Sequence, residues 1–291
     1  MPNPLDFLIN GQRNTSTRPA NLQDREGLVA LIHDAHALHR HLDWMQPLDW
    51  LGSEPFWLME NTRHIQAALA MPPDPPGAAW IRLFACLHAS CVQDAWDSLL
   101  EKCLAYFQLQ PASVVAIGLS AWFTQLLSNS GFKVYQDIVV LQADLSTAFA
   151  VSRMAPEVTI RPIQSSDMEQ VLIVDQSAFE CIWQVSVEGL EHACKTAAYT
   201  SVAVVEDRVV GYQLSTSTPF SAHLARLAVL PEFQGRGIGS GLVHDLRDTF
   251  LQSDITELTV NTQGSNSASL HLYKKLGIHL TDDKFPVFML Q

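Results

Sequence analysis

The chain of 291 residues carries 30 acidic and 18 basic residues, a net charge of −12. This acidity argues against nucleic-acid and membrane-surface roles, because both partners present negative phosphates. No apolar run reaches about 18 residues, so no membrane span is expected. The five cysteines show no paired CxxC spacing, which indicates reduced thiols and a cytoplasmic protein.

The first half alternates strand and helix patterns. Helical periodicity over 24–42 is followed by a Trp-rich segment that prolines interrupt, which predicts a loop, and by a Pro-rich turn at 71–77. The segment AWIRLFACL, at 79–87, predicts one continuous strand. The remaining predicted elements are a helix over 93–107, a strand at 113–117, a helix over 121–130 and a strand at 135–143. Periodicity is then lost over 145–157, which predicts a linker.

The second half shows the same alternation. A strand at 158–163 and a helix after Ser165 are followed by a hairpin whose tight turn is placed at Glu206-Asp207-Arg208. The segment AHLARLAVL, at 222–230, predicts a third strand and leads into a glycine-rich stretch. The remaining predicted elements are a helix through Phe250, a strand at 257–261, a helix over 267–275 and a strand at 287–290.

The two halves resemble each other. A shift of 143 residues places AWIRLFACL over AHLARLAVL, and a shift of 146 places NSGFKV over KLGIHL. The identities are few, but strands and helices follow in the same order. We therefore predict a diverged tandem repeat with domains at 1–150 and 157–291.

The stretch LPEFQGRGIGSGL places four of the chain's fourteen glycines at one strand-to-helix junction. Such a junction presents backbone N–H groups and the positive end of a helix dipole, which suits an anionic phosphate. The dinucleotide motif G-x-G-x-x-G fails because Ser240 and Leu242 stand where its last glycine is needed. A Walker loop fails because no lysine follows. A plain flexible connection is the remaining alternative.

Two motifs resemble the GNAT superfamily of acetyl-CoA-dependent N-acetyltransferases. Q-x-x-G-x-G is present as Gln234, Gly237 and Gly239, and NSASLHLYKKLGI resembles the segment N-x-x-A-x-x-L-Y-x-K-x-G-F. In the second motif Ser269 replaces the Ala and Ile278 the Phe. The resemblance covers 157–291 and implies a mixed α/β sheet flanked by helices, in two GNAT-like domains in tandem.

The resemblance implies that acetyl-CoA is the co-substrate. No metal is expected, because the histidine spacing does not fit a zinc site. The pantetheine arm of acetyl-CoA would lie along the strand that ends near Val229, and its pyrophosphate would sit on the glycine loop. The implied binding residues are Leu227, Ala228, Val229, Gln234, Gly235, Arg236, Gly237, Ile238, Gly239, Ser240 and Asn266.

Two catalytic residues are expected. The family places at Tyr273 the hydroxyl that protonates the leaving thiolate, and a packing role for Tyr273 is the less favoured alternative. His223 stands five residues before Ala228, where the histone-acetylating branch has a Glu base. Its near-neutral pKa suits removal of a proton from an amine, but an ordinary strand-end histidine is as good an explanation.

The first half is expected to lack the cofactor site. At the shift of 143, Gly235, Gly237 and Gly239 fall on Val92, Asp94 and Trp96, which bring side chains where the pyrophosphate would lie. The histidines at 33, 36, 39 and 41 do not have the i, i+4 spacing of a helical zinc site.

The expected activity is transfer of an acetyl group to a primary amine, with a small-molecule acceptor favoured by the acidic chain. Two alternatives stay open: a non-catalytic acyl-CoA-binding or sensor protein, and a structural repeat protein whose halves merely pair. The acceptor, the acyl chain length and a homodimer also stay open.

Overall fold

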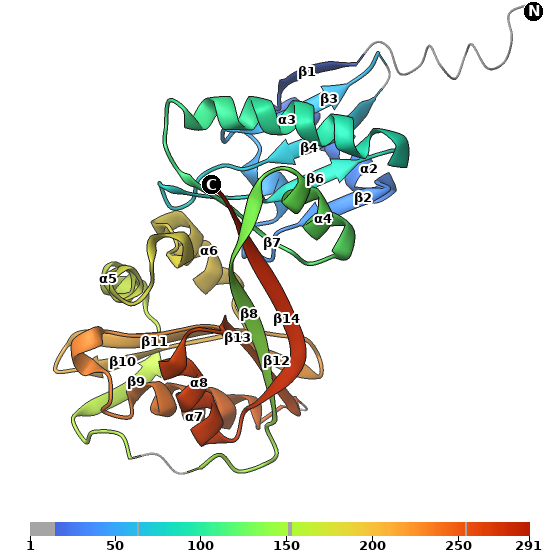
Figure 1. Ribbon diagram of the computed structural model, residues 1–291. Helices are drawn as coiled ribbons and strands as arrows, with labels where there is room; N and C mark the ends of the chain where they lie inside the picture. The colour runs from blue at the N-terminus through green and yellow to red at the C-terminus, as the bar shows by residue number, and fades with distance from the viewer. Residues whose placement is uncertain (1–14, 63, 151–152, 254) are drawn as a thin grey trace, which may run out of the picture. The chain divides into compact units, whose positions relative to one another are not determined.

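The computed structural model describes residues 15–62, 64–150, 153–253 and 255–291 (Figure 1). The chain divides into two compact units. Unit 1 comprises Met1–Lys133 with Phe288–Gln291, and unit 2 comprises Val134–Val287. The division thus falls inside a strand, ahead of the linker that the loss of periodicity had indicated, and the end of the chain returns to unit 1.

Unit 1 contains a five-stranded sheet in the order β1-β3-β4-β6-β2, and outside that sheet β5 pairs in parallel with β7. Its strands are β1 (Ser16–Pro19), β2 (Ala37–Arg40), β3 (Phe56–Glu60), β4 (Ile65–Ala70), β5 (Ala78–Trp80), β6 (Leu83–Cys86) and β7 (Ser113–Ile117). Its helices are α2 (Arg25–Asp34), α3 (Val92–Phe107) and α4 (Ala121–Asn129), with short 3-10 turns at Leu22–Asp24, Pro47–Trp50 and Ala89–Cys91.

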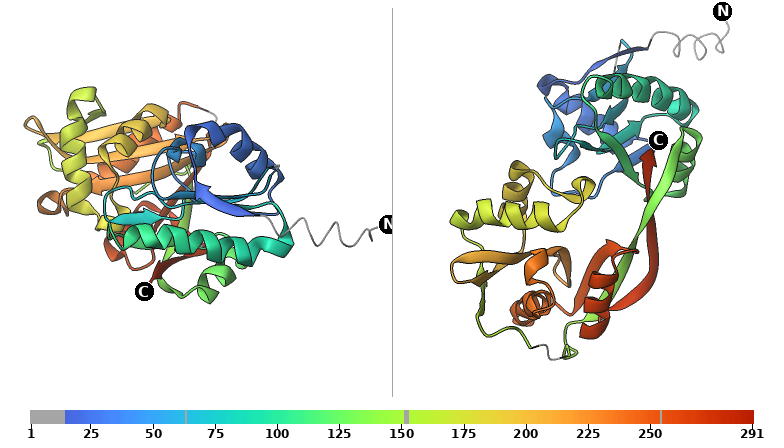
Figure 2. Two further views of the ribbon diagram at one scale, coloured as in Figure 1. Left: turned by 90° about the horizontal axis from the view of Figure 1, so that it is seen from above. Right: turned by 60° about the vertical axis from the view of Figure 1, so that its left-hand side comes forward.

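Helices α2 and α3 lie on opposite faces of the five-stranded sheet (Figure 2). Strand β4 is buried along its whole length, and its side chains alternate between two apolar clusters. Ala67 and Leu69 pack on the α3 side, whereas Ala68 and Ala70 pack on the α2 side. A strand covered on both faces needs no polar alternation, which explains why its sequence gave no strand signal.

Two predicted elements of unit 1 are wrong. The helix expected over 24–42 ends at Asp34, because Ala35 takes the extended angles φ −59° and ψ 129°, and Ala37–Arg40 pairs with β6 as β2. The strand expected over 79–87 is broken at Ile81 and Arg82. Its first part, β5, pairs with β7, and its second part, β6, pairs with β4 and β2.

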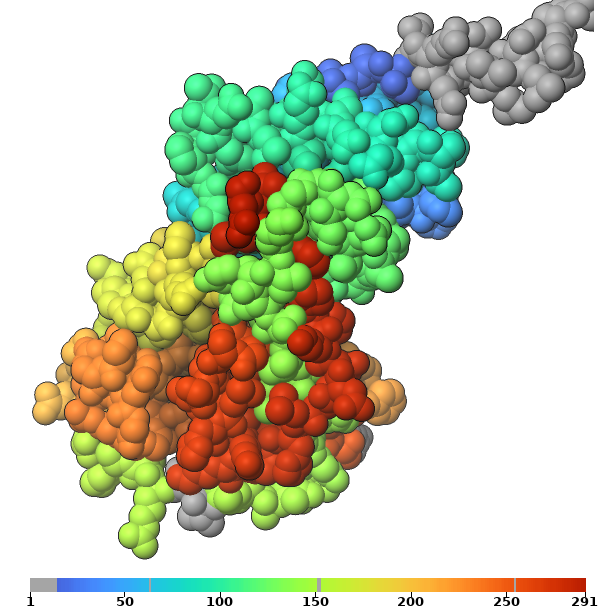
Figure 3. Space-filling view, in the orientation of Figure 1, coloured from blue at the N-terminus to red at the C-terminus, as the bar shows by residue number. Residues whose placement is uncertain are grey.

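Unit 2 has the strand order β14-β8-β13-β12-β11-β10-β9. Its strands are β8 (Phe132–Asp144), β9 (Val158–Pro162), β10 (Tyr199–Val205), β11 (Arg208–Ser217), β12 (Ser221–Val229), β13 (Glu257–Gln263) and β14 (His279–Leu290). Its helices are α5 (Met168–Ala178), α6 (Val187–Thr196), α7 (Ile238–Phe250) and α8 (Ser267–Leu276), with 3-10 turns at Ser165–Asp167, Cys181–Trp183 and Pro231–Phe233. Strands β8 and β14 lie side by side on the face seen in Figure 3.

The hairpin of β10 and β11 turns where the sequence predicts it. Glu206 and Asp207 both take positive φ, 49° and 64°, the combination that a two-residue turn needs to match the twist of its strands. Helices α5 and α6 lie on one face of the sheet and α7 and α8 on the other (Figure 1). The face toward α7 and α8 holds a core that includes Leu224, Val243, Leu258 and Leu276.

Within the described ranges, no helix combines the length and the apolar character that crossing a membrane requires.

Candidate active site

Strands β12 and β13 separate part-way along their length. They pair in parallel over Ser221–Leu224 and Glu257–Val260, but β12 continues to Val229 and β13 to Gln263. The cause lies on the other side of β12, where the register against β11 shifts and leaves Ala225 as an extra residue. A bulge of this kind bends its strand and increases its twist. The bend leaves an unpaired backbone edge after Leu224.

The peptide groups on this edge can be assigned from the register. The N–H of Leu230 donates to the Val210 carbonyl in β11 at 2.9 Å. Because peptide groups alternate along a strand, those of Leu227 and Val229 face away from β11. The Val229 carbonyl accepts the side-chain amide of Gln234 at 3.1 Å, which ties the following loop back to the strand. The remaining groups on the edge can bond an extended ligand as an added strand would.

The loop after β12 turns the chain into α7 through two left-handed glycines. Gly235 has φ +76°, and Gly237, the N-cap of α7, has φ +78°. The first intrahelical bond of α7 runs from the Gly241 N–H to the Gly237 carbonyl at 2.9 Å. The N–H groups of Ile238, Gly239 and Ser240 therefore lie in the first turn, where a helix offers no acceptor. No described side chain caps this end, so the groups are available to an anion.

The four glycines serve different purposes. At Gly235 an added Cβ would meet nothing within 4 Å. At Gly239 it would lie 3.1 Å from Leu272 of α8, and at Gly241 it would lie 2.6 Å from Met154. At Gly237 it would lie 2.5 Å from the carbonyl oxygen of Arg153. Three of the glycines thus allow close packing against α8 or the chain before β9, and Gly235 alone opens onto free space.

Positive charge lies beside this loop. The guanidinium groups of Arg208 and Arg236 stack on Phe233, with centroid distances of 5.4 and 4.8 Å. Arg208 also pairs with the exposed Glu232 at 2.8 Å. Exposed pairs of this kind contribute little to stability. Glu232 balances the charge of Arg208, so Arg236 is the cation that adds to the positive potential of the α7 N-terminus.

His223 lies on β12 one residue before the pairing with β13 ends. Its Nδ1 is 2.8 Å from Oγ1 of Thr259, the residue opposite it on β13, and that hydroxyl donates to the Ala222 carbonyl at 3.4 Å. In the tautomer in which the hydroxyl accepts from Nδ1–H, Nε2 is the basic nitrogen. Burial lowers the pKa of His223, so the ring is neutral at pH 7. A neutral imidazole is able to accept a proton.

Tyr273 lies on α8 among the buried residues of the core, with 3% of its surface exposed. Burial raises the pKa of its phenol, so the group stays protonated. Among the described residues its hydroxyl has no hydrogen-bond partner. The other member of the second motif, Asn266, caps α8 by accepting the Ser269 N–H at 3.0 Å. Asn266 therefore has a structural role that explains its presence without a ligand.

A buried polar network lies on the opposite face of β12, and the sequence gave no prediction of it. Asp175 of α5 accepts Arg226 Nε at 2.5 Å and the Tyr212 hydroxyl, and its other oxygen accepts the Val185 N–H at 3.1 Å. Arg226 also donates to the Trp183 carbonyl at 2.6 Å and stacks 4.1 Å from the Phe179 ring centroid. The network fixes α5 and the 179–185 segment to the sheet. The sequence feature that could have indicated this network is a single arginine, Arg226, inside an otherwise apolar predicted strand.

Unit 1 repeats this network but not the glycine loop. Arg82 binds Asp43, donates to the Asp74 carbonyl at 3.0 Å and stacks 4.7 Å from the Trp50 ring. The connection from β6 to α3, however, has five residues, 87–91, against eight, 230–237, from β12 to α7. None of the five is a glycine or has positive φ.

Trp96 of unit 1, aligned with Gly239, is fully buried and donates from Nε1 to Ser130 Oγ at 2.6 Å. Phe84 and Phe123 pack edge-on against its indole. Aromatic side chains thus fill the region beside the start of α3.

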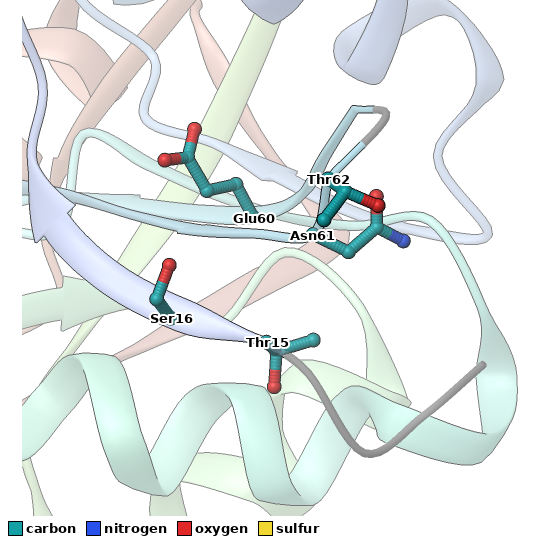
Figure 4. Close-up of a pocket in the computed structure, with 5 residues that line it drawn as sticks. All are labelled: Thr15, Ser16, Glu60, Asn61 and Thr62. Atoms are coloured by element: carbon teal, nitrogen blue, oxygen red, sulfur yellow. The ribbon is translucent and has the colours of Figure 1, made fainter. Parts of the chain in front are cut away.

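Other features do not form a site. A pocket of about 360 Å³ in unit 1 is lined by Thr15, Ser16, Glu60, Asn61 and Thr62 (Figure 4). Its carboxylate, Glu60, forms a two-point ion pair with Arg18. The described ranges contain no group of three or more His, Cys, Asp or Glu side chains placed to hold a metal ion.

Residues 168–278 match a family model described as the acetyltransferase (GNAT) family. Unit 2 contains a GNAT acetyltransferase domain. Two relatives support this assignment, and each matches about two-fifths of the chain. The [ribosomal protein bS18]-alanine N-acetyltransferase of Haemophilus influenzae is 26% identical over 42% of the chain and 82% of its own length. An N-alpha-acetyltransferase of Sulfurisphaera tokodaii is 27% identical over 44% of the chain and 84% of its own length.

The GNAT fold extends beyond the matched domain. A solved tandem GNAT protein from the clavulanic acid biosynthesis pathway aligns over 95% of this chain and 98% of its own, with a TM-score of 0.63. At 14% identity this likeness shows the fold alone. The predicted architecture, two GNAT-like α/β domains in tandem, is confirmed, and the chain contains a GNAT-type acyltransferase domain.

Proposed function

We propose that unit 2 transfers an acetyl group from acetyl-CoA to a primary amine. The observation that carries this proposal is the unpaired edge of β12, which ends directly at the glycine loop and the uncapped start of α7. An extended chain of amides followed by a pyrophosphate matches these two features in order. The pantetheine amides would bond the edge at Leu227 and Val229, with Ala228 between them.

The pyrophosphate would bind along the loop. The contributing residues would be Gln234, Gly235, Arg236, Gly237, Ile238, Gly239 and Ser240, most of them through backbone N–H groups. Hydrogen bonds to charged groups are worth about 1.5–3 kcal/mol each, whereas a helix dipole contributes about 0.3–1 kcal/mol. The loop therefore contributes more than the dipole. Asn266 would act indirectly by fixing the start of α8.

The chemistry would use the residues around the opened edge. A neutral amine attacks the thioester carbonyl, and a strand N–H near Val229 stabilises the negative oxygen that forms. His223 Nε2 takes up the amine proton, and Tyr273 donates its proton to the departing CoA sulfur. The thiolate has a reference pKa of about 8.5 and a phenol one of about 10, so this donation requires direct contact.

Two classes of acceptor are candidates. The charge of −12 favours a cationic small molecule such as a polyamine, which an acidic protein attracts at long range. The named relatives favour the α-amino group of a protein N-terminus, because one is named for a ribosomal protein alanine and the other as an N-alpha-acetyltransferase. Both acceptors present the same primary amine.

Unit 1 would have no part in binding acetyl-CoA. Its β6–α3 connection is three residues shorter than the loop of unit 2 and lacks left-handed residues, and Trp96 with its aromatic neighbours fills the adjoining space. Titration with CoA should give one site per chain. Two equivalent sites would overturn this assignment.

The decisive experiment measures thiol release from acetyl-CoA with a panel of acceptors: a polyamine, free amino acids, an aminoglycoside and a peptide with an N-terminal alanine. At least one acceptor should accelerate release and gain an acetyl group in mass, and its N-acetylated form should be inert. CoA binding without turnover on any amine would instead indicate a binding or sensor protein. Absence of both binding and turnover would indicate a structural repeat protein.

A further inference from the structure

Two cysteines of unit 1 are in contact at the place where unit 2 has its glycine loop. Cys86 ends β6, and Cys91 is the N-cap of α3, the position that Gly237 holds before α7. Their sulfur atoms are 3.2 Å apart. Both thiols also approach the His88 carbonyl, at 3.5 Å from Cys86 and 3.2 Å from Cys91. The chain from Cys86 to Cys91 thus folds so that the two sulfur atoms are in contact.

The two thiols differ in access. Cys86 is fully buried in the core cluster of unit 1, whereas Cys91 is partly exposed. Burial raises the pKa of the Cys86 thiol to about 12, so Cys86 does not react first with a reagent in solution. Cys91 can be reached from solvent, and Cys86 lies within reach of whatever forms there.

We propose that Cys86 and Cys91 form a reversible intramolecular disulfide that joins the end of β6 to the start of α3. The Cys91 thiolate attacks one sulfur of a low-molecular-weight disulfide such as oxidised glutathione and releases the first glutathione thiol. Cys86 then gives up its proton and displaces the second glutathione from the mixed disulfide. Two cysteine thiols are oxidised, one glutathione disulfide is reduced to two thiols, and no further electron acceptor is needed.

The arrangement fits a bond better than a chance contact. The distance between the two sulfur atoms must shorten by only about 1 Å to reach the S–S bond length of about 2.05 Å. The connection that would close is short and already carries a hydrogen bond from the Cys91 N–H to the His88 carbonyl at 3.2 Å. This inference does not depend on the proposed acetyltransferase activity, because the pair lies in unit 1.

The test oxidises the full chain, carrying Cys181→Ser to remove an exposed thiol, in a series of glutathione buffers. Free thiols are then counted with a chromogenic disulfide reagent, and the linkage is identified by peptide mapping. The chain should fall from four free thiols to two, and a peptide pair joined at Cys86 and Cys91 should appear. Dithiothreitol should restore all four.

Matched variants separate this result from general thiol oxidation. Cys103→Ser, which removes a buried thiol of α3, should still lose two thiols. Cys91→Ser should lose none, and Cys86→Ser should instead carry one glutathione on Cys91. Because Cys86 lies in the core, Cys86→Ala serves as a second version of that variant. The proposal is overturned if Cys86 and Cys91 keep their thiols across the whole series, including the buffer that contains oxidised glutathione alone, or if the linkage joins other cysteines.

Discussion

Arg226 Nε lies 2.5 Å from Asp175 Oδ2, and the carboxylate that receives it is completely buried. Removing Asp175 would leave a buried guanidinium without its counter-ion, since the remaining contacts of Arg226 are a phenol, a carbonyl and an aromatic ring. Loss of one partner of such a pair costs about 3–5 kcal/mol. Asp175→Ala should therefore lower the free energy of unfolding by about that amount, as measured by urea denaturation.

Glu191→Ala is the control for this prediction. It removes an exposed carboxylate from the Lys195 pair on α6, and the expected cost is below about 1 kcal/mol. Equal costs for the two variants would show that the buried network does not hold α5 to the sheet.

The backbone anion site can be tested at Gly235, where a side chain meets open space. Asn and Asp both tolerate left-handed backbone angles and are nearly identical in shape. Gly235→Asp should bind CoA at least about tenfold more weakly than Gly235→Asn, because two charges about 5 Å apart repel by about 3 kcal/mol at an effective dielectric of 20. Calorimetric titration measures the difference. Equal affinities would place the pyrophosphate elsewhere.

A substitution at Gly237 would not test the same point. Its Cβ would collide with the Arg153 carbonyl, so lost binding and disturbed folding could not be told apart. Thermal unfolding of the two Gly235 variants should give matching midpoints, which confirms that charge alone separates them.

The assignment of His223 as the base predicts a pH profile. Burial lowers the pKa of His223 below its ordinary value of 6.5, so the acid limb of kcat/KM should lie below pH 6.5, with a plateau above it. His223→Gln should reduce kcat about 100-fold and abolish that limb, with CoA affinity unchanged. If the variant keeps both the kcat of the unchanged protein and the acid limb of the pH profile, a group other than His223 accepts the proton.

Tyr273→Phe tests the acid role while keeping the buried ring. The hydroxyl has no partner among the described residues, so its removal should change the free energy of unfolding by less than about 1 kcal/mol. The value of kcat should fall about 100-fold or more if the hydroxyl protonates the CoA sulfur. An unchanged kcat would leave Tyr273 as a packing residue of α8.

The stability of unit 1 should fall in acid because of His39. This buried ring stacks on Phe123, and burial lowers its pKa to about 4, against 6.5 in the unfolded chain. Between those values the unfolded chain binds more protons, so stability is complete above pH 6.5 and falls as the pH drops toward 4. The loss should reach about 3 kcal/mol at 1.36 kcal/mol per pKa unit.

Denaturation at a series of pH values measures this slope. His39→Gln should flatten the slope, whereas His33→Gln, at an exposed position on α2, should leave it unchanged. Identical slopes in both variants would assign the acid sensitivity to other groups, such as His41, whose pKa burial also lowers.

The sequence was informative where the structure is local. Gly235 and Gly237 adopt the left-handed angles that their spacing indicates, and Asn266 caps the helix that carries Tyr273. Both motifs could be found from spacing because a turn, a cap and a helix register depend on residues only a few positions apart. The hairpin turn at Glu206 and Asp207 is of the same kind.

The elements that the sequence missed depend on distant partners. Strand β4 shows no alternation because both of its faces are covered, and β2 is extended because it pairs with β6 some 45 residues later. The break at Ile81 and Arg82 arises because β5 and β6 have different neighbours. The ion pair of Asp175 with Arg226 joins residues 51 positions apart.

The sequence by itself therefore determined the repeat and the glycine loop, because both depend on the spacing of residues close together in the chain. It also supplied Tyr273 and His223 as the residues proposed for acetyl transfer. Only the tertiary structure decided that β12 leaves β13 after Leu224, that three of the four glycines are packing contacts, and that Cys86 meets Cys91. These features arise from strand pairing and side-chain packing between segments that are far apart in the sequence. Such contacts must offset the entropy lost on closing long loops, and they produce no periodic pattern in the sequence.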